Sequence, residues 1–343
     1  MRVAMYYSNS DVRIEEVPIP EIEPGELLIR VHASGICGSD VLEWYRIDKV
    51  PLVLGHEIAG EIVKVGKGLE GFKVGDRISA SHHVPCEECH YCLSGHETTC
   101  ETLRKTKFYP GGFSEYIRLP EINVQKGVYP LPDSISYEEA TFTEPLACVL
   151  RGQRLAEMQK GKTVLVLGSG ISGLLHVKLA HALGAKRIIA TDINDYRLQK
   201  AKEFGADGAI HAKEDLPNCL HRINDGKLAD LVILCTGAKA AILQALKSVE
   251  RGGTILFFAA SDKDAAISLT VNDVFWRNEV TLTSSYAATP GEHIEALGLI
   301  ASGKVDVKEM ITHRLPLAEA HIGFKLVTET ANESIKVIIE PQK

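Results

Sequence analysis

The chain has 343 residues and a mass of 37.5 kDa, which is enough for two domains that each bury a core. Its net charge of −7 provides no basic field for nucleic acid or for an anionic membrane surface. No apolar run reaches the roughly 18 residues that cross a bilayer, and the N-terminal residues MRVAMYYSNSDVRIEE lack the apolar core of a signal peptide. We therefore expect a cytoplasmic protein that binds neither nucleic acid nor membrane.

The first 150 residues predict a β-rich module. Short stretches of alternating polar and apolar residues, separated by glycine and proline, are typical of strands. The clearest of them are LLIRVHASG (27–35), IAGEIVKVG (58–66), DRISAS (76–81) and FSEYIRL (113–119).

Four of the eight cysteines fall within residues 84–100, VPCEECHYCLSGHETTC: Cys86, Cys89, Cys92 and Cys100. Disulfides rarely persist in a reducing cytosol, so clustered thiols there indicate a metal site or redox chemistry. Four thiolates fill the tetrahedral shell of zinc and leave no position open for substrate. We therefore predict a structural zinc site, with a dithiol redox role of the C-x-x-C pairs as the alternative.

Other ligand-type residues are scattered along the module. Cys37 lies in GICGSD, His56 and Glu57 lie in LGHEIAG, and Glu144 lies in TEPLACV. A catalytic zinc needs about three protein ligands and one open position, which Cys37, His56 and Glu144 can supply. No spacing rule brings these residues together, and each residue type alone is more often structural. We interpret the remaining candidates near the cysteines as surface residues: His82, His83, His90, His96 and Glu97.

From about residue 162, apolar strands alternate with helical patterns. The strands are TVLVLG (163–168), RIIATD (187–192), ADLVILCTG (229–237) and GGTILFFAA (252–260), with helices between them. This alternation predicts a parallel, doubly wound sheet. After about residue 290, a helix and the closing strand SIKVIIEP return the chain to the first module.

The sequence LVLGSGISGLL indicates a dinucleotide site between the first of these strands and its helix. Gly168, Gly170 and Gly173 form the pattern G-x-G-x-x-G, Ile171 begins the helix, and Asp192 ends the next strand. The glycines permit a tight turn, a close approach of pyrophosphate and close packing of helix on strand. A carboxylate at Asp192 can accept hydrogen bonds from an adenosine ribose and would repel a 2′-phosphate. We predict NAD rather than NADP, although the nearby Arg197 could accommodate that phosphate.

The order of motifs GICGSD, VLGHEIAGEIVKVG, GDRI, the four-cysteine loop, GGFSEY, EPLACV and GSGISG resembles the zinc-dependent medium-chain alcohol dehydrogenases, most closely the sorbitol and threonine dehydrogenase branch. The resemblance spans essentially the whole chain. It implies an α/β protein in which a GroES-like catalytic domain (1–150 and 290–343) accompanies a Rossmann NAD-binding domain (151–289). It also implies two Zn²⁺ ions per chain and a homodimer or homotetramer.

By the same resemblance, Cys37 and His56 are catalytic zinc ligands, and Ser39 passes the alcohol proton outward. Glu57 is an exchangeable ligand or supports the ligands from behind, and Glu144 is a ligand directly or through water. Hydride then moves between a secondary alcohol or polyol and NAD, with zinc acidifying the alcohol. The chain carries Leu42, Glu43 and Ser285 where relatives have histidine, tyrosine and arginine, so sugar-alcohol phosphates and hydroxy amino acids stay open as substrates. The alternatives are a zinc-free NADPH quinone or enone reductase of the same fold and a non-catalytic dinucleotide-binding protein.

Overall fold

A computed structural model describes residues 1–329 and 332–343 of the chain. The chain divides into two compact units, one formed by Met1–Ala147 with Ala287–Lys343 and the other by Cys148–Tyr286. The predicted boundaries at 150 and 290 lie close to these limits. No helix in the described part is long and apolar enough to cross a membrane.

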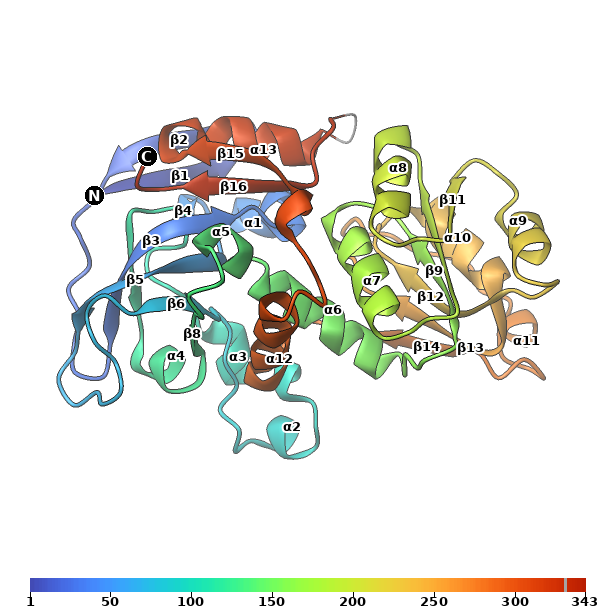
Figure 1. Ribbon diagram of the computed structural model, residues 1–343, viewed down its shortest axis with the longest axis horizontal. Helices are drawn as coiled ribbons and strands as arrows, with labels where there is room; N and C mark the ends of the chain where they lie inside the picture. Colours follow the sequence, from blue (N-terminus) through green and yellow to red (C-terminus); the bar gives the residue numbers. More distant parts are fainter. Residues whose placement is uncertain (330–331) are drawn as a thin grey trace. The chain divides into compact units, whose positions relative to one another are not determined.

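The first unit is built mainly on antiparallel strands, with β15 and β16 paired in parallel (Figure 1). Its larger sheet has the order β15-β16-β3-β5-β6-β8, with β7 pairing β3, and its smaller sheet has the order β2-β1-β4. The strands are β1 (Arg2–Ser8), β2 (Asp11–Glu16), β3 (Leu27–Gly35), β4 (Leu52–Val53), β5 (Glu57–Val65), β6 (Arg77–Ala80), β7 (Tyr116–Leu119), β8 (Val128–Pro130), β15 (Ile311–Pro316) and β16 (Lys336–Glu340).

Short helices connect these strands. They are η1 (Gly38–Val41), α1 (Glu43–Arg46), η2 (Ile47–Lys49), α2 (His90–Leu93), η3 (Glu97–Thr99), α3 (Glu101–Lys105), α4 (Glu121–Lys126), α5 (Tyr137–Ala140), α12 (Pro290–Ala301), η4 (Lys308–Met310), η5 (Leu317–Glu319) and α13 (Ala320–Thr328). The helix α6 (Thr143–Leu155) begins in the first unit and continues into the second. The predicted strands therefore exist, and the C-terminal strand closes the first module as expected.

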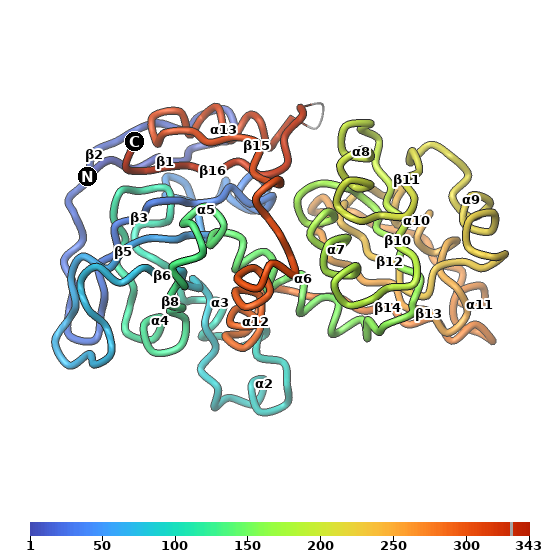
Figure 2. The backbone as a smooth tube through the Cα atoms, in the orientation of Figure 1, coloured from blue at the N-terminus to red at the C-terminus, as the bar shows by residue number. Residues whose placement is uncertain are grey.

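Register in the large sheet decides which residues meet. The antiparallel pairing of β3 with β5 places Gly35 opposite Glu57. Because Cys37 follows two residues after Gly35 and His56 immediately precedes Glu57, this register brings the two motifs GICGSD and LGHEIAG to the same end of the strand pair. The last strand, β16, pairs the other edge of β3 with Ile338 opposite Gly35. Figure 2 shows this C-terminal segment returning to the N-terminal strands.

The second unit has a parallel six-stranded sheet with the order β11-β10-β9-β12-β13-β14. Its elements are β9 (Thr163–Leu167), α7 (Ile171–Ala182), β10 (Arg187–Asp192), α8 (Asp195–Glu203), β11 (Gly208–His211), α9 (Leu216–Ile223), β12 (Ala229–Leu234), α10 (Lys239–Ser248), β13 (Val249–Phe257), α11 (Val271–Val274) and β14 (Thr281–Ser284). The central strand β9 is fully buried. An apolar strand covered by helices on a parallel sheet is the pattern that the sequence predicted.

Candidate metal centres and dinucleotide site

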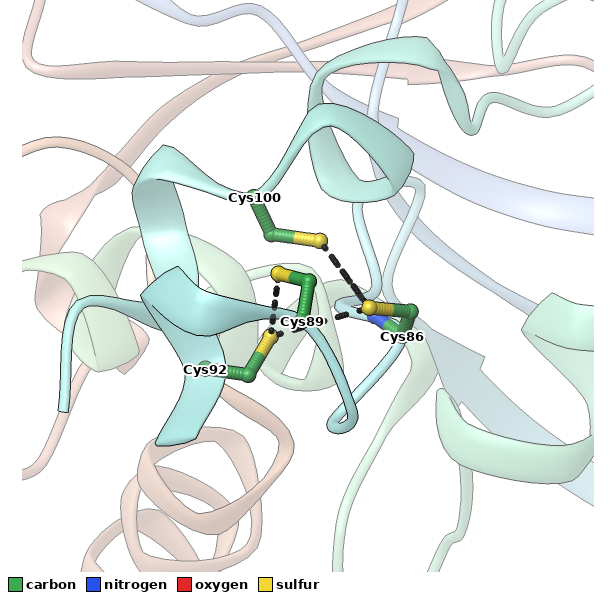
Figure 3. Close-up of side chains that lie close together, drawn as sticks. All are labelled: Cys86, Cys89, Cys92 and Cys100. Carbon is green, nitrogen blue, oxygen red and sulfur yellow. Dashed lines mark hydrogen bonds between the residues drawn. The ribbon is translucent and has the colours of Figure 1, made fainter. Parts of the chain in front are cut away.

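The four cysteines of residues 86–100 converge on one point (Figure 3). Their sulfurs lie 3.5 Å apart for Cys86 and Cys100, 3.6 Å for Cys89 and Cys92, and 3.9 Å for Cys86 and Cys92. Sulfurs bound at about 2.3 Å to one tetrahedral zinc are about 3.8 Å apart, whereas a disulfide joins them at about 2.05 Å. The spacing fits a shared zinc and excludes disulfides.

The ionisation of these thiols also calls for a cation. Burial opposes the charged form of Cys100, but hydrogen bonds from the backbone of Cys86 and Leu103 outweigh it and lower the pKa of its thiol to about 6. Burial, with a hydrogen bond to Cys89, raises the pKa of Cys92 to about 12. A dication at the centre would let all four sulfurs ionise together.

A second group joins Cys37, His56 and Glu57, whose ligand atoms lie within 4.8 Å of one another. Cys37 is the N-cap of η1, so its sulfur accepts a hydrogen bond from the backbone N–H of Ser39. Gly55, just before His56, has a φ of +92°, and a Cβ there would lie 2.8 Å from the backbone nitrogen of Phe113. The turn into β5 therefore needs glycine, and it delivers His56 to Cys37.

Asp40 contacts both Cys37 and His56 and supports this group, a role that our sequence interpretation missed. Its carboxylate is fully buried, accepts from the backbone N–H of Cys37 at 3.1 Å and lies 3.4 Å from Nδ1 of His56. Burial by itself lowers the pKa of His56, but the charges of Asp40 and Cys37 outweigh it and hold the pKa well above its usual value. With Nδ1 directed at Asp40, Nε2 is the nitrogen left for a metal, as in carboxylate–histidine–zinc arrangements.

Ser39 lies beside the predicted ligand Cys37. Its hydroxyl donates to the Cys37 sulfur at 3.4 Å. Arg46, from α1, donates through Nη2 to the Ser39 hydroxyl at 3.4 Å and through Nε to the Ser39 carbonyl at 3.1 Å. Arg46 also lies 3.7 Å from the buried Asp40. The relay candidate is thus held by two side chains from the same short segment.

The remaining predicted ligand, Glu144, is not part of this group as it is found in the described residues. Glu144 is buried in the first turn of α6, and the metal-type group found in the described residues comprises only Cys37, His56 and Glu57. Its role as a ligand, direct or through water, stays a prediction. Glu57 is itself paired with the fully buried Lys336, which the sequence interpretation did not single out.

Two histidines interpreted as surface residues lie partly buried, one of them, His82, beside His56 of the metal group. The ring of His82 lies 4.7 Å from that of His56 and 3.7 Å from that of His83. Burial holds the pKa of His82 well below its usual value and lowers that of His83 to about 4. Both side chains are half-buried rather than fully on the surface, and neither belongs to a metal-type group in the described residues. His90 and His96 are exposed, as expected.

The glycine motif has the geometry that dinucleotide binding requires. Gly168 has a φ of +95°, a conformation that L side chains rarely adopt. A Cβ on Gly173 would lie 1.9 Å from the carbonyl oxygen of Gly168, whereas one on Gly170 would meet nothing within 4 Å. Gly170 caps α7 without a side-chain hydrogen bond, and Ile171 is the first helical residue. The backbone at the helix N-terminus is therefore approachable by phosphate oxygens.

Asp192 and Arg197 lie next to this turn. The Asp192 carboxylate accepts from the backbone N–H of Ser169 at 2.7 Å and from that of Asn194 at 2.9 Å. It therefore fixes the glycine turn in addition to any contact with a ribose. Arg197 lies in the first turn of α8, and its Nε is buried without a hydrogen-bond partner in the described part of the chain.

With this fold and these groups, the family can be established by comparison. Residues 23–133 match the alcohol dehydrogenase GroES-like domain, and residues 172–302 match the zinc-binding dehydrogenase domain. The chain belongs to the zinc-binding alcohol dehydrogenase family. Membership confirms the predicted family, the α/β fold class with its GroES-like and Rossmann parts, and an oxidoreductase acting on CH–OH groups.

Individual relatives cover nearly the whole chain. Sorbitol dehydrogenase from Bacillus subtilis (strain 168) is 34% identical over 100% of this chain and 98% of its own length. L-threonine 3-dehydrogenase from Bacillus licheniformis is 35% identical over 95% of this chain and 94% of its own. A crystal structure from Sinorhizobium meliloti, described as a zinc-binding dehydrogenase bound to NADP, is 28% identical with a TM-score of 0.88 and covers 99% of each chain. The names of the two Bacillus relatives agree with the predicted sorbitol and threonine branch.

Proposed function

We propose that the protein oxidises a secondary alcohol of the polyol type with NAD, at a zinc held by Cys37 and His56. The observation that carries this proposal is the convergence of Cys37, His56 and Glu57 within 4.8 Å beside the buried Asp40. One thiolate, one imidazole and one carboxylate form a donor set that suits zinc. Zinc bound there supplies Lewis acidity, which lowers the pKa of an alcohol toward neutrality.

The chain's own residues supply position and proton transfer. Asp40 holds the His56 ring by its Nδ1 side and receives the backbone N–H of Cys37, so both ligands are fixed before substrate binds. We expect Ser39 to accept the alcohol proton, and its hydroxyl contacts with Cys37 and Arg46 support this role. Glu57 and Glu144 remain the candidates for a third protein ligand.

We infer NAD as the cofactor, which accepts the hydride. A buried carboxylate at Asp192, at the end of β10, favours a ribose hydroxyl and opposes a 2′-phosphate. Arg197 and the NADP bound to the Sinorhizobium meliloti relative argue for the other cofactor. The engagement of Asp192 with the glycine turn supports NAD, since backbone N–H groups hold its buried negative charge beside that turn.

The substrate class rests on the relatives and on the residues of the site. Sorbitol dehydrogenase supports a polyol, and L-threonine 3-dehydrogenase supports a 3-hydroxy amino acid. At the position where sorbitol dehydrogenases carry tyrosine, Glu43 accepts a hydrogen bond from the backbone N–H of Asn9 at 3.0 Å. This departure from the sorbitol dehydrogenase pattern keeps sugar-alcohol phosphates and 3-hydroxy amino acids among the candidate substrates.

We also propose a cytoplasmic homo-oligomer, with a dimer as its basic unit. The strand β14 is the outer strand of the parallel sheet, and large apolar side chains near it are exposed: Val271, Phe275, Trp276 and Leu282. An open edge with apolar neighbours is a site for pairing with another strand. Two copies can pair β14 with β14 about a twofold axis, which satisfies both edges at once.

A single experiment tests the central proposal. The zinc-loaded protein is assayed for NAD and NADP reduction with polyols, simple secondary alcohols, sugar-alcohol phosphates and 3-hydroxy amino acids, and its zinc content is measured. The proposal expects two zinc ions per chain and fastest turnover with a polyol and NAD. Fewer than two zincs with NADPH-driven enone reduction would favour the zinc-free reductase. Dinucleotide binding without any turnover would favour a non-catalytic protein.

A further inference from the structure

A buried lysine contacts the candidate catalytic metal group. Lys336, at the start of β16, is 1% exposed, and its Nζ contacts Oε2 of Glu57, which is also 1% exposed. The two residues are 279 positions apart in the chain. The C-terminal strand therefore delivers a positive charge directly to a carboxylate that belongs to the metal group.

The residues around Lys336 and Glu57 leave room for their contact. A Cβ on Gly35, the residue of β3 opposite Glu57, would lie 2.2 Å from Oε2 of Glu57 and 2.7 Å from Nζ of Lys336. Only glycine leaves room for this contact. The ring of Phe142 lies 5.4 Å from the same ammonium and offers a favourable aromatic face.

Stability alone does not account for such a pair. Removing two charges from water is costly, and replacing a buried ion pair by apolar residues is often neutral or stabilising. Glu57 is the one ion-pair partner found for Lys336 in the described part of the chain. The same carboxylate lies within 4.8 Å of the ligand atoms of Cys37 and His56. A metal at those ligands and the lysine ammonium are thus two cations that share one carboxylate.

We propose that Lys336 is a positioning residue that competes with the catalytic metal for Glu57. By holding Oε2 and by its own positive charge, Lys336 weakens the bond between Glu57 and the metal, and so keeps one coordination position exchangeable for substrate. This inference rests on the proposed metal site at Cys37 and His56. It assigns to the last strand a part in tuning the metal.

The test removes the charge and follows the metal as well as turnover. In Lys336→Met, Glu57 has no competing cation, so zinc should leave this site on the order of ten-fold more slowly when a chelator is added. The maximal rate should fall, because Glu57 now occupies the position that substrate needs. Cobalt substitution should give an altered visible spectrum, which reports a change in the ligands themselves.

Three further variants make the test specific. Lys336→Gln keeps a hydrogen-bond donor without the charge and should change zinc release in the same direction if Lys336→Met folds poorly. In the double variant Lys336→Met/Glu57→Gln, the slower zinc release expected for Lys336→Met alone should be largely lost. Lys308→Met is the matched control, because Lys308 pairs with the mostly buried Glu139 at 3.6 Å but is itself exposed; its zinc release should equal that of the wild type.

The outcomes separate this inference from the proposed function. Zinc release from the wild type is compared with zinc release from Cys37→Ser. The release phase that is absent in Cys37→Ser belongs to the catalytic site. If the wild type has no such phase, the metal site itself is wrong and the inference fails with it. If the phase exists but is unchanged or faster in both Lys336→Met and Lys336→Gln, with an unchanged cobalt spectrum, the metal site stands and the role of Lys336 is refuted.

Discussion

The four thiols of residues 86–100 come from one loop, whereas Cys37, His56 and Glu57 come from two motifs that strand register brings together. The thiol group fills a tetrahedral shell with protein ligands, and the second group offers a smaller, mixed set of donors. The thiol cluster packs with Leu103 at its own small core, while the second group is backed by Asp40 and Lys336. The difference suggests that a site complete within a loop serves stability, and a site assembled across a sheet serves chemistry.

Cys37→Ser should produce the largest effect. Loss of the thiolate removes the metal that acidifies the alcohol, so kcat should fall by about a thousand-fold, equivalent to ~4 kcal/mol of transition-state stabilisation. Steady-state kinetics measure this fall, and zinc analysis should find one ion per chain. Calorimetric titration with NAD should give nearly wild-type affinity, because the glycine motif is untouched. Near-normal turnover would remove Cys37 from the site.

Asp40→Asn should have the next largest effect, at the same site. The amide no longer offers a negative charge to His56, so zinc affinity should fall by about 10- to 100-fold. Competition with a chelator measures this change. The exposed Asp48, on the neighbouring η2, provides the matched control Asp48→Asn. Equal zinc affinities in the two variants would show that Asp40 does not support the metal.

Cys100→Ser should lower stability and leave turnover nearly unchanged, the opposite of the effect expected for Cys37→Ser. The loop loses one of four zinc ligands, so the unfolding temperature should fall by several degrees and one zinc should be lost. Activity per correctly folded chain should change little. Scanning calorimetry and zinc analysis check this expectation. A variant with unchanged unfolding temperature but no turnover would overturn the division between a structural and a catalytic site.

The smallest expected effect is on the pH dependence of the unfolding free energy, and it comes from the buried His176 rather than from a predicted zinc ligand. Burial lowers the pKa of His176 to about 3, against an ordinary 6.5. The unfolded chain binds this proton below pH 6.5 and the folded chain does not, so stability falls as the pH drops from 6.5 toward 3. At pH 5 the loss from this residue is about 2 kcal/mol. The free energy of unfolding in denaturant should therefore drop less between pH 7.5 and pH 5 in His176→Gln.

The exposed His181, on the same helix α7, gives the matched control His181→Gln. Its unfolding free energy should retain the wild-type dependence on pH. An equal pH dependence in wild type and His176→Gln would show that His176 does not contribute to acid sensitivity.

The strands and helices named from the sequence were predictable because strand alternation and apolar runs are local patterns, whereas elements such as β1, β2 and β15 were not singled out. The four cysteines were predictable for the same reason, since their spacing lies within one loop. Asp40 was missed although it follows Ser39 directly, because its role depends on the ring of His56. A signal was present: an acidic residue in GICGSD, next to a candidate ligand, is a candidate hydrogen-bond partner for a metal-binding histidine.

Lys336 and the histidines after β6 were missed because their surroundings are set by tertiary structure. Lys336 opens the apolar run KVIIE, and a lone charge in a buried strand could have indicated a buried partner. No local pattern names that partner as Glu57. His82 and His83 follow β6, whose last three residues are all buried, so no alternation in that strand distinguished the burial of the two histidines.

The most direct measurement is anomalous diffraction at the zinc absorption edge from crystals of the protein grown with zinc and NAD. We expect two peaks per chain, one among Cys86, Cys89, Cys92 and Cys100. The second should lie about 2.3 Å from the sulfur of Cys37 and about 2.0 Å from Nε2 of His56. A single peak at the four thiols, with none at Cys37 and His56, would contradict the account.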